Sequence, residues 1–285
     1  MKTKKHVRGP KKTTTKCKFN RYKKHPVKKR TKSICKDKLL NFENNVEKVI
    51  IFDLDETIGC FQRLYSLFYY INEHRQKNKY YNLSFYEKVK ILDDNPYFLR
   101  TNILSIFTKL GLLQEKNNIR VVIFTNNTGG YDWPNFIRNY INFKLKKKII
   151  SQVIPIYKNN DIIYEPLRTS NEKRYNDLCR CLNIPSTTEV CFIDDREHDQ
   201  MYSDNVSYIR VKEYKYFPNL KKLLNNLISN KKYTELIPNI ENFMETNDKN
   251  LINKRIIEEG NINLMKEMIE TENIKTRIFK YIFKK

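Results

Sequence analysis

The sequence lacks any long apolar run. Its 285 residues include no segment that approaches the roughly 20 apolar residues needed to span a bilayer, so no membrane span is expected. The basic start is not followed by the apolar stretch of a signal peptide, so no signal peptide is expected either. These absences exclude the transmembrane and secreted classes and favour an intracellular protein, cytoplasmic or nuclear.

Cysteine is sparse and scattered, at positions 17, 35, 60, 179, 181 and 191. Cys179 and Cys181 are separated by one residue, which is not the spacing of a metal site. Cys191 falls within an apolar stretch, where a small buried hydrophobic residue is the better interpretation. The pattern indicates a reducing compartment and no disulfide framework.

Acidic residues are almost absent from the first 38 residues. This segment holds seventeen Lys or Arg and one acid, Asp37, so it carries +16 of the total net charge of +23. It has no apolar periodicity and cannot bury enough surface to offset its ordering entropy, so residues 1–40 are predicted to form a disordered basic arm. The arm could bind nucleic acid, an acidic partner or a membrane surface, and Lys28–Lys32 could act as a nuclear localisation patch. A solvating tail without a dedicated partner is the alternative.

The most informative stretch that is present runs from Val49 to Gly59 and reads Val-Ile-Ile-Phe-Asp-Leu-Asp-Glu-Thr-Ile-Gly. Its apolar start has the length and β-branched content of a buried strand. Asp53 and Asp55 follow, and in an extended backbone both carboxylates would point to one face at the strand's carboxyl end, where α/β sheets bind ligands. Two acids this close raise one another's pKa unless a cation lies between them, which indicates chemistry. An ordinary acidic surface loop is the alternative.

Two more apolar runs end in polar groups. Val121–Phe124 is followed by Thr125, Asn126 and Asn127, where a hydroxyl and backbone N–H groups offer neutral donors for a phosphate. The two amides are also typical of a turn. The stretch from Glu189 reads Glu-Val-Cys-Phe-Ile-Asp-Asp and ends in Asp194 and Asp195, whose oxygens suit a hard divalent cation.

The segment between these two runs offers several basic residues that could face the same edge of the sheet. Apolar residues at 175, 178, 179 and 182 predict a helix over residues 171–182, with Ser170 as its N-cap. Lys173 would lie in the first turn and point toward the carboxyl edge of the sheet. Arg168 and Arg174 are the alternatives.

These motifs, in this order from about Val46 to Lys222, resemble those of the haloacid dehalogenase (HAD) superfamily of phosphohydrolases. The Asp-Leu-Asp-Glu-Thr form is most similar to the branch of RNA polymerase II C-terminal-domain phosphatases and their NLI-interacting-factor-like relatives. The resemblance implies an α/β fold, a doubly wound parallel sheet with helices on both faces. It also implies that Asp53 is the nucleophile of an aspartyl-phosphate mechanism and that Asp55 is its general acid and base.

The same resemblance implies the rest of the site. Thr125 and Lys173 would be catalytic, and the phosphate would be bound by Thr57, Thr125, Asn126 and Lys173. Mg²⁺ would be held at Asp53, Asp194 and the backbone carbonyl of Asp55. Asp195 occupies a position that is often Asn in the closest phosphatases, and it would bind the metal through water or orient Lys173.

The remaining segments are assigned more coarsely. Residues 61–118 leave room for a small helical insertion, with a loop at His74–Tyr81, and such a small cap would leave the site open to macromolecules. A helix with Pro134 in its first turn should follow Thr125, with Trp133 in the core rather than stacking on a ligand. The HAD-like domain is placed at residues 41–230. A leucine stripe is expected beyond Pro218, and residues 231–285 should form a helical C-terminal extension.

The expected function is magnesium-dependent phosphomonoester hydrolysis, with a phosphoprotein such as a polymerase tail as the substrate of a Ser/Thr phosphatase. The basic arm keeps a nucleic-acid 3′-end phosphatase open as a second hypothesis. A catalytically idle HAD-fold adaptor for nucleic acid or protein is the third, and it predicts a lost nucleophile or metal acid.

Overall fold

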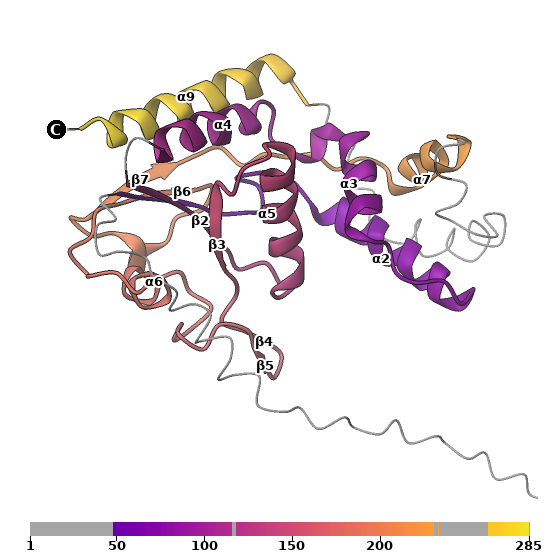
Figure 1. Cartoon of the computed structure of the whole chain (residues 1–285), viewed down its shortest axis with the longest axis horizontal. Helices are drawn as coiled ribbons and strands as arrows, with labels where there is room; N and C mark the ends of the chain where they lie inside the picture. Colours follow the sequence, from indigo (N-terminus) through magenta and orange to yellow (C-terminus); the bar gives the residue numbers. More distant parts are fainter. Residues whose placement is uncertain (1–47, 116–117, 231–232, 234–261, 285) are drawn as a thin grey trace, which may run out of the picture. The chain divides into compact units, whose positions relative to one another are not determined.

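A computed structural model of the chain describes residues 48–115, 118–230, 233 and 262–284 (Figure 1). The predicted basic arm, with its patch at Lys28–Lys32, lies outside the described residues. So does residue range 234–261 of the predicted C-terminal extension. Among the helices of the described part, none combines the length and the apolar character that a bilayer span requires.

The centre of the fold is a parallel sheet of five strands in the order β3-β2-β1-β6-β7. The strands are β1 (Lys48–Phe52), β2 (Ile119–Phe124), β3 (Ile150–Ile154), β6 (Val190–Asp194) and β7 (Val206–Arg210). β1 is the middle strand and pairs with β2 on one side and β6 on the other. The strand order therefore reverses beside β1, and this is the kind of point at which open α/β sheets bind ligands.

Side chains along each inner strand alternate between two cores. Ile50 and Phe52 of β1 face the larger core, with helices α4 (Ile103–Gln114), α5 (Asp132–Lys144) and α9 (Leu264–Ile282). Val49 and Ile51 face the smaller core, with helix α6 (Tyr175–Leu182). Figure 1 shows α4 and α9 together over one face and α6 across the sheet from them. The predicted α/β class, with helices on both faces, is confirmed.

The predicted insertion after β1 contains α2 (Gln62–Lys77), α3 (Phe85–Asp93) and the 3₁₀ turn η1 (Pro96–Phe98). The loop predicted at His74–Tyr81 is wrong at its start, because α2 continues through Lys77. Arg75 explains the difference: it is buried, and its guanidinium donates to Tyr81 O and Glu87 Oε1 at 2.6 and 3.1 Å. These contacts span 6 and 12 residues, and the polar composition of the segment does not reveal them.

Other local expectations are confirmed. Pro134 lies in the first turn of α5, Trp133 and Cys191 are buried, and the leucine stripe forms the buried face of α7 (Leu220–Ser229). The described part of the extension is helical, as α9. The antiparallel pair β4 (Lys158–Asn159) and β5 (Ile162–Ile163) and the 3₁₀ turn η2 (Asp199–Met201) were not expected from the sequence.

Candidate active site

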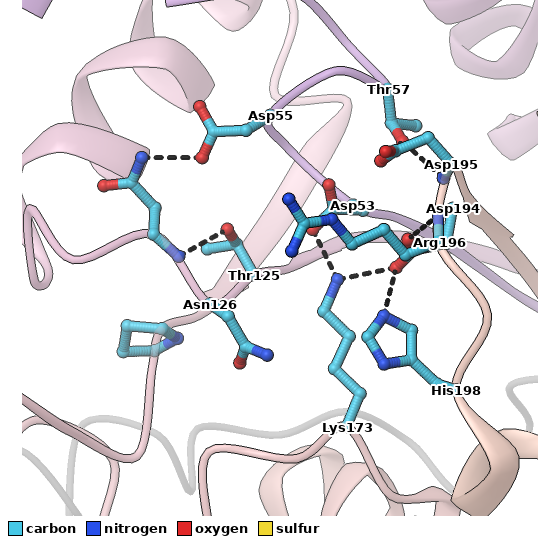
Figure 2. A network of polar contacts seen from close by, with 12 residues as sticks. Asp53, Asp55, Thr57, Thr125, Asn126, Lys173, Asp194, Asp195, Arg196 and His198 are labelled. Atoms are coloured by element: carbon cyan, nitrogen blue, oxygen red, sulfur yellow. Dashed lines mark hydrogen bonds and ion pairs between the residues drawn. The ribbon is translucent and has the colours of Figure 1, made fainter. Parts of the chain in front are cut away.

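The acids and the hydroxyl singled out in the sequence meet at the carboxyl ends of three adjacent strands (Figure 2). Phe52 of β1 is in register with Ile123 of β2 and Ile193 of β6. Asp53 and Asp194 directly follow these paired residues, and Thr125 follows Phe124, the last residue of β2, so all three emerge at the same edge of the sheet. Backbone pairing continues past the strands, since Asp53 N donates to Ile193 O at 2.8 Å. The sheet itself thus brings together residues separated by more than 100 positions.

Lys173 binds two of these carboxylates at once. Its Nζ contacts Asp53 Oδ1 and lies 2.7 Å from Asp194 Oδ2. Only 2% of Lys173 and 1% of Asp194 is exposed, so the ammonium and its partners are shielded from water. His198 reaches the same Asp194 oxygen beside Lys173, with Nε2 3.3 Å from Oδ2 (Figure 2).

The predicted helix around Lys173 begins later than expected. α6 starts at Tyr175, and Lys173 lies in the preceding loop. Ser170 is not its N-cap, because the Ser170 hydroxyl accepts a hydrogen bond from Glu172 N at 3.2 Å within that loop. The loop stays non-helical because buried Arg168 takes up its carbonyls, donating to Asn171 O at 3.0 Å and Glu172 O at 3.3 Å.

Neither Arg168 nor Arg174, the two alternatives to Lys173, contacts the acids of the site through a described interaction. Arg168 lies below the loop, where its guanidinium donates to Thr125 O at 3.1 Å, Pro155 O at 2.7 Å and Asn126 Oδ1 at 2.7 Å. Arg174 pairs with Glu172 on the surface at 2.7 Å. Arg168 therefore connects the loop after β2 to the loop before α6 through hydrogen bonds. Lys173 supplies the positive charge inside the site.

Burial and mutual repulsion set the protonation of the acids. Burial, together with Asp194 and Asp55, holds the pKa of Asp53 well above its usual range, although Lys173 opposes the shift. Burial also opposes ionisation of Asp194, but Lys173 and His198 outweigh it and bring the pKa of that carboxyl below its usual range. Burial raises the pKa of Asp55, partly offset by the hydrogen bond from Asn127. Asp194 is thus the acid most firmly held as an anion.

Three carboxylates form a cluster that could hold a metal ion. Oxygens of Asp53, Asp194 and Asp195 all lie within 4.8 Å of one another. One ammonium, that of Lys173, cannot neutralise three carboxylates, and hard oxygen donors with excess negative charge fit Mg²⁺. Among the described residues this cluster does not include the carboxylate of Asp55.

Asp55 and Asp195 each have a different polar partner. Asp55 Oδ2 accepts a hydrogen bond of 2.6 Å from Asn127 Nδ2. Asp195 pairs with Thr57, whose hydroxyl donates to Asp195 Oδ1 and accepts from Asp195 N, both at 3.1 Å. Thr57 is buried under the acids and is not among the residues that line the cleft. Its described contacts place it as a support for Asp195.

The acids open into a cleft of about 480 Å³. Its lining includes most of the polar residues singled out in the sequence, three aromatic side chains and two further basic residues. These are Asp53, Asp55, Thr125, Asn126, Lys173, Asp194 and Asp195, then Phe61, Tyr65 and Trp133, and finally Arg196 and His198. Thr125 Oγ1 accepts from Asn127 N at 3.0 Å, so its hydroxyl hydrogen remains to be donated to a ligand. Asn126 Oδ1 is held by Arg168, which leaves the amide N–H groups of Asn126 as donors.

Three residues of the site were missed or given another role by sequence reasoning. Asn127 was interpreted as turn chemistry, His198 was not considered, and Arg168 was weighed only as a phosphate-neutralising group. The signal for Asn127 was its place directly after a strand, among the other polar strand ends. The role of Arg168 depends on carbonyls 13 and 43 residues away, which no local pattern encodes.

The sequence matches no protein-family model, and no curated protein matches it. Among solved structures, the chain is similar to the HAD domain of the effector protein Lem4 from Legionella pneumophila. The two share 14% sequence identity, with a TM-score of 0.40, over 66% of this chain and 97% of that domain. The α/β class given above rests on the strand order and on the two cores of this chain, and not on that likeness.

Proposed function

We propose that this chain is a HAD-type, magnesium-dependent phosphomonoester hydrolase that works through an aspartyl-phosphate. The observation that carries the proposal is the convergence of Asp53 and Asp194 on Lys173 at the carboxyl end of the central strand, with Asp55 and Thr125 on the same cleft. A paired nucleophile and acid, a buried ammonium and a hydroxyl donor are the groups that phosphoryl transfer uses.

In the first step an Asp53 carboxylate oxygen attacks phosphorus. The Asp53 oxygen–phosphorus bond forms while the bond to the leaving oxygen breaks, and Asp55 gives that oxygen its proton. The raised pKa of Asp55, caused by burial, favours the protonated form that this step requires. Asn127 fixes the carboxyl group by bonding one of its oxygens.

In the second step water cleaves the aspartyl-phosphate. Asp55, now ionised, removes a proton from the water, whose oxygen attacks phosphorus and displaces the Asp53 carboxylate. Inorganic phosphate is released and both acids return to their starting states. Asp55 therefore acts once as an acid and once as a base.

Charge on the phosphoryl oxygens is balanced by the surrounding donors. Lys173 supplies an ammonium, and the Thr125 hydroxyl and Asn126 amide supply neutral donors from the loop after β2. When bound by Asp53, Asp194, Asp195 and the carbonyl of Asp55, Mg²⁺ would neutralise part of this charge. Thr57 contributes by holding Asp195.

We further propose a phosphoprotein Ser/Thr phosphatase of the polymerase C-terminal-domain type, on the basis of the Asp-Leu-Asp-Glu-Thr resemblance. A panel of phosphoserine peptides and 3′-phosphorylated oligonucleotides tests this. Faster turnover of the peptides supports it, and faster turnover of the oligonucleotides supports the nucleic-acid-end alternative. Binding of either class without phosphate release would favour the idle adaptor.

The reaction class is tested by magnesium-dependent release of phosphate from a generic aryl phosphate. Asp53→Asn should lower turnover at least about 10³-fold because it removes the nucleophile. Asp161→Asn, which changes an exposed acid in the β4–β5 turn, is the matched control and should behave as the wild type. Turnover of Asp53→Asn within a few-fold of the control would overturn the assignment.

A further inference from the structure

We propose that Glu267, in the C-terminal helix α9, is a positioning residue for the catalytic turn that follows β1, and that it acts through Arg100. The catalytic turn is defined as residues 54–59, between the nucleophile and the first residues of the insertion. The proposal rests on the function proposed above, because that function gives the turn its role. It assigns a task in catalysis to the part of the chain beyond the HAD-like domain.

Arg100 binds the backbone of the catalytic turn. Only 1% of this residue is exposed. Its Nε donates to Thr57 O at 2.7 Å, and its Nη2 donates to Glu56 O at 2.7 Å and to Lys212 O at 2.6 Å. One guanidinium therefore joins two successive carbonyls of the catalytic turn to the segment after β7.

Glu267 supplies the remaining partner of this guanidinium. Its Oε2 lies 3.2 Å from Arg100 Nη1. A buried charge that loses its counter-ion keeps its desolvation cost, so Arg100 without Glu267 would be held less firmly, by its three bonds to carbonyls alone. The guanidinium is planar, and its N–H donors are fixed relative to one another. A rotation that follows the loss of the Nη1 contact would therefore also move the Nε and Nη2 donors.

Two further contacts of α9 fix the position of Glu267 relative to Arg100. Thr271, one turn further along the helix, donates from Oγ1 to Thr101 O at 2.7 Å, next to Arg100 in the chain. Glu270 Oε1 accepts from Lys212 N at 3.1 Å, beside the third carbonyl that Arg100 holds. Three residues of α9 thus fix the same small region behind the acids.

The catalytic turn needs this support because its backbone is strained. Glu56 adopts φ +59°, a left-handed conformation that costs energy for a residue other than glycine. The turn also transmits its position to the acids, since Thr57, whose carbonyl Arg100 holds, bonds Asp195 through its hydroxyl. The path from α9 to the acid cluster is therefore Glu267, Arg100, Thr57 and Asp195.

The test compares Glu267→Ala and Glu267→Gln with Glu272→Ala in the full chain. Glu272 lies on the same helix but pairs with Lys275 on the surface, so its substitution is the matched control. Hydrogen exchange of the amides of Glu56, Ile58 and Asp195 reports the turn directly, because these amides bond Gly59 O, Leu54 O and Thr57 Oγ1. We expect about 10-fold faster exchange at these amides in Glu267→Ala and an intermediate effect in Glu267→Gln.

Turnover provides the second measurement. For an aryl phosphate, Glu267→Ala should lower kcat about 5- to 20-fold while KM changes less than about 2-fold, since the turn aligns reacting groups and contributes little to substrate binding. Glu267→Asp, which keeps the charge, should recover part of kcat. Control-like exchange and kcat in both Glu267→Ala and Glu267→Gln would overturn the proposal.

The exchange measurement keeps this inference separate from the proposed function. If the wild type hydrolyses no phosphate ester, the proposed function fails, whereas faster exchange in Glu267→Ala would still establish the link from α9 to the turn. If Glu267→Ala does not fold, Glu267→Gln, which keeps the size and one acceptor oxygen, carries the test alone. Hydrolysis by the wild type together with unchanged exchange and kcat in Glu267→Gln would then reject the positioning role.

Discussion

Asn127 donates a hydrogen bond of 2.6 Å to Asp55, and this contact joins the loop after β2 to the loop after β1. The other end of the same amide accepts from Gly129 N at 2.8 Å, so the side chain is held at both ends. Asp55 therefore depends on a neighbouring strand for its orientation, as well as on its own place two residues after Asp53.

Replacing Asn127 by Ala should lower kcat about 10- to 100-fold with a smaller change in KM, because general acid catalysis is worth about 10²–10⁴-fold and requires an aligned proton. Steady-state kinetics on an aryl phosphate measure this. Asn159→Ala is the control, since Asn159 also bonds the loop after β2, at Thr128 O, but lies on the surface. Equal kcat values for the two variants would contradict the role of Asn127.

Magnesium should stabilise the folded chain, by an amount that grows with the logarithm of its concentration above Kd. At a concentration 100 times its Kd, a ligand that binds only the folded state adds about 2.7 kcal/mol to the free energy of unfolding. Thermal unfolding with and without EDTA measures the shift in Tm. Asp194→Asn should abolish most of it, whereas Glu197→Gln, an exposed acid three residues away, should retain it. An unchanged shift in Asp194→Asn would remove that residue from the metal site.

Gly59→Ala should destabilise the chain by about 1–3 kcal/mol, the usual cost of overpacking. A Cβ at this position would lie 2.3 Å from Phe98 O and 2.5 Å from Phe61 Cζ. Gly111→Ala, in the middle of α4, is a useful comparison. There the Cβ would lie 3.0 Å from side-chain atoms of buried Ile149 and meet no backbone atom among its nearest contacts, and alanine gains about 1 kcal/mol of helix propensity. Urea unfolding of both variants should place Gly59→Ala well below Gly111→Ala.

The charge on Glu267 should cost stability as the pH rises. Burial, reinforced by Glu270, raises the pKa of Glu267 above its ordinary value of 4.5, and Arg100 and Lys212 offset this only in part. The folded state then binds more protons than the unfolded state, so the free energy of unfolding falls as the pH rises from 4.5 through the raised pKa.

This pH dependence is measured by urea unfolding of the wild type and Glu267→Gln at several pH values. The wild type should lose stability relative to the variant as the pH rises above 4.5, because only the wild type ionises at this position. A difference that stays constant, or one that grows in favour of the wild type, would contradict the shift.

Sequence reasoning was most successful where local pattern and tertiary structure agree. The runs that end at Phe52, Phe124 and Ile193 are apolar at every position, as strands buried on both faces require, and each is a strand of the sheet. Because parallel strands end at one edge, the meeting of Asp53, Thr125 and Asp194 followed from the strands alone.

The errors arose where a buried arginine side chain binds backbone carbonyls beside the predicted element boundary. Residues 171–174 carry no helix breaker, yet Arg168 takes the carbonyls of Asn171 and Glu172 and the helix begins at Tyr175. In the same way Arg75 draws His74 and its neighbours into α2 through contacts with Tyr81 and Glu87. A buried guanidinium can satisfy several carbonyls at once, and its choice of partners is not visible in sequence spacing.

The place of β1 in the middle of the sheet has a consequence for the order of folding. This strand is made before both of its neighbours, and its second partner, β6, begins about 140 residues later. Closing so large a loop is entropically costly, which makes such long-range pairing slow. During synthesis on the ribosome the edge of β1 that later receives β6 must wait for Val190–Asp194 to emerge. The acids therefore come together late, and a chain interrupted before that point would carry Asp53 and Asp55 without Asp194 and Asp195.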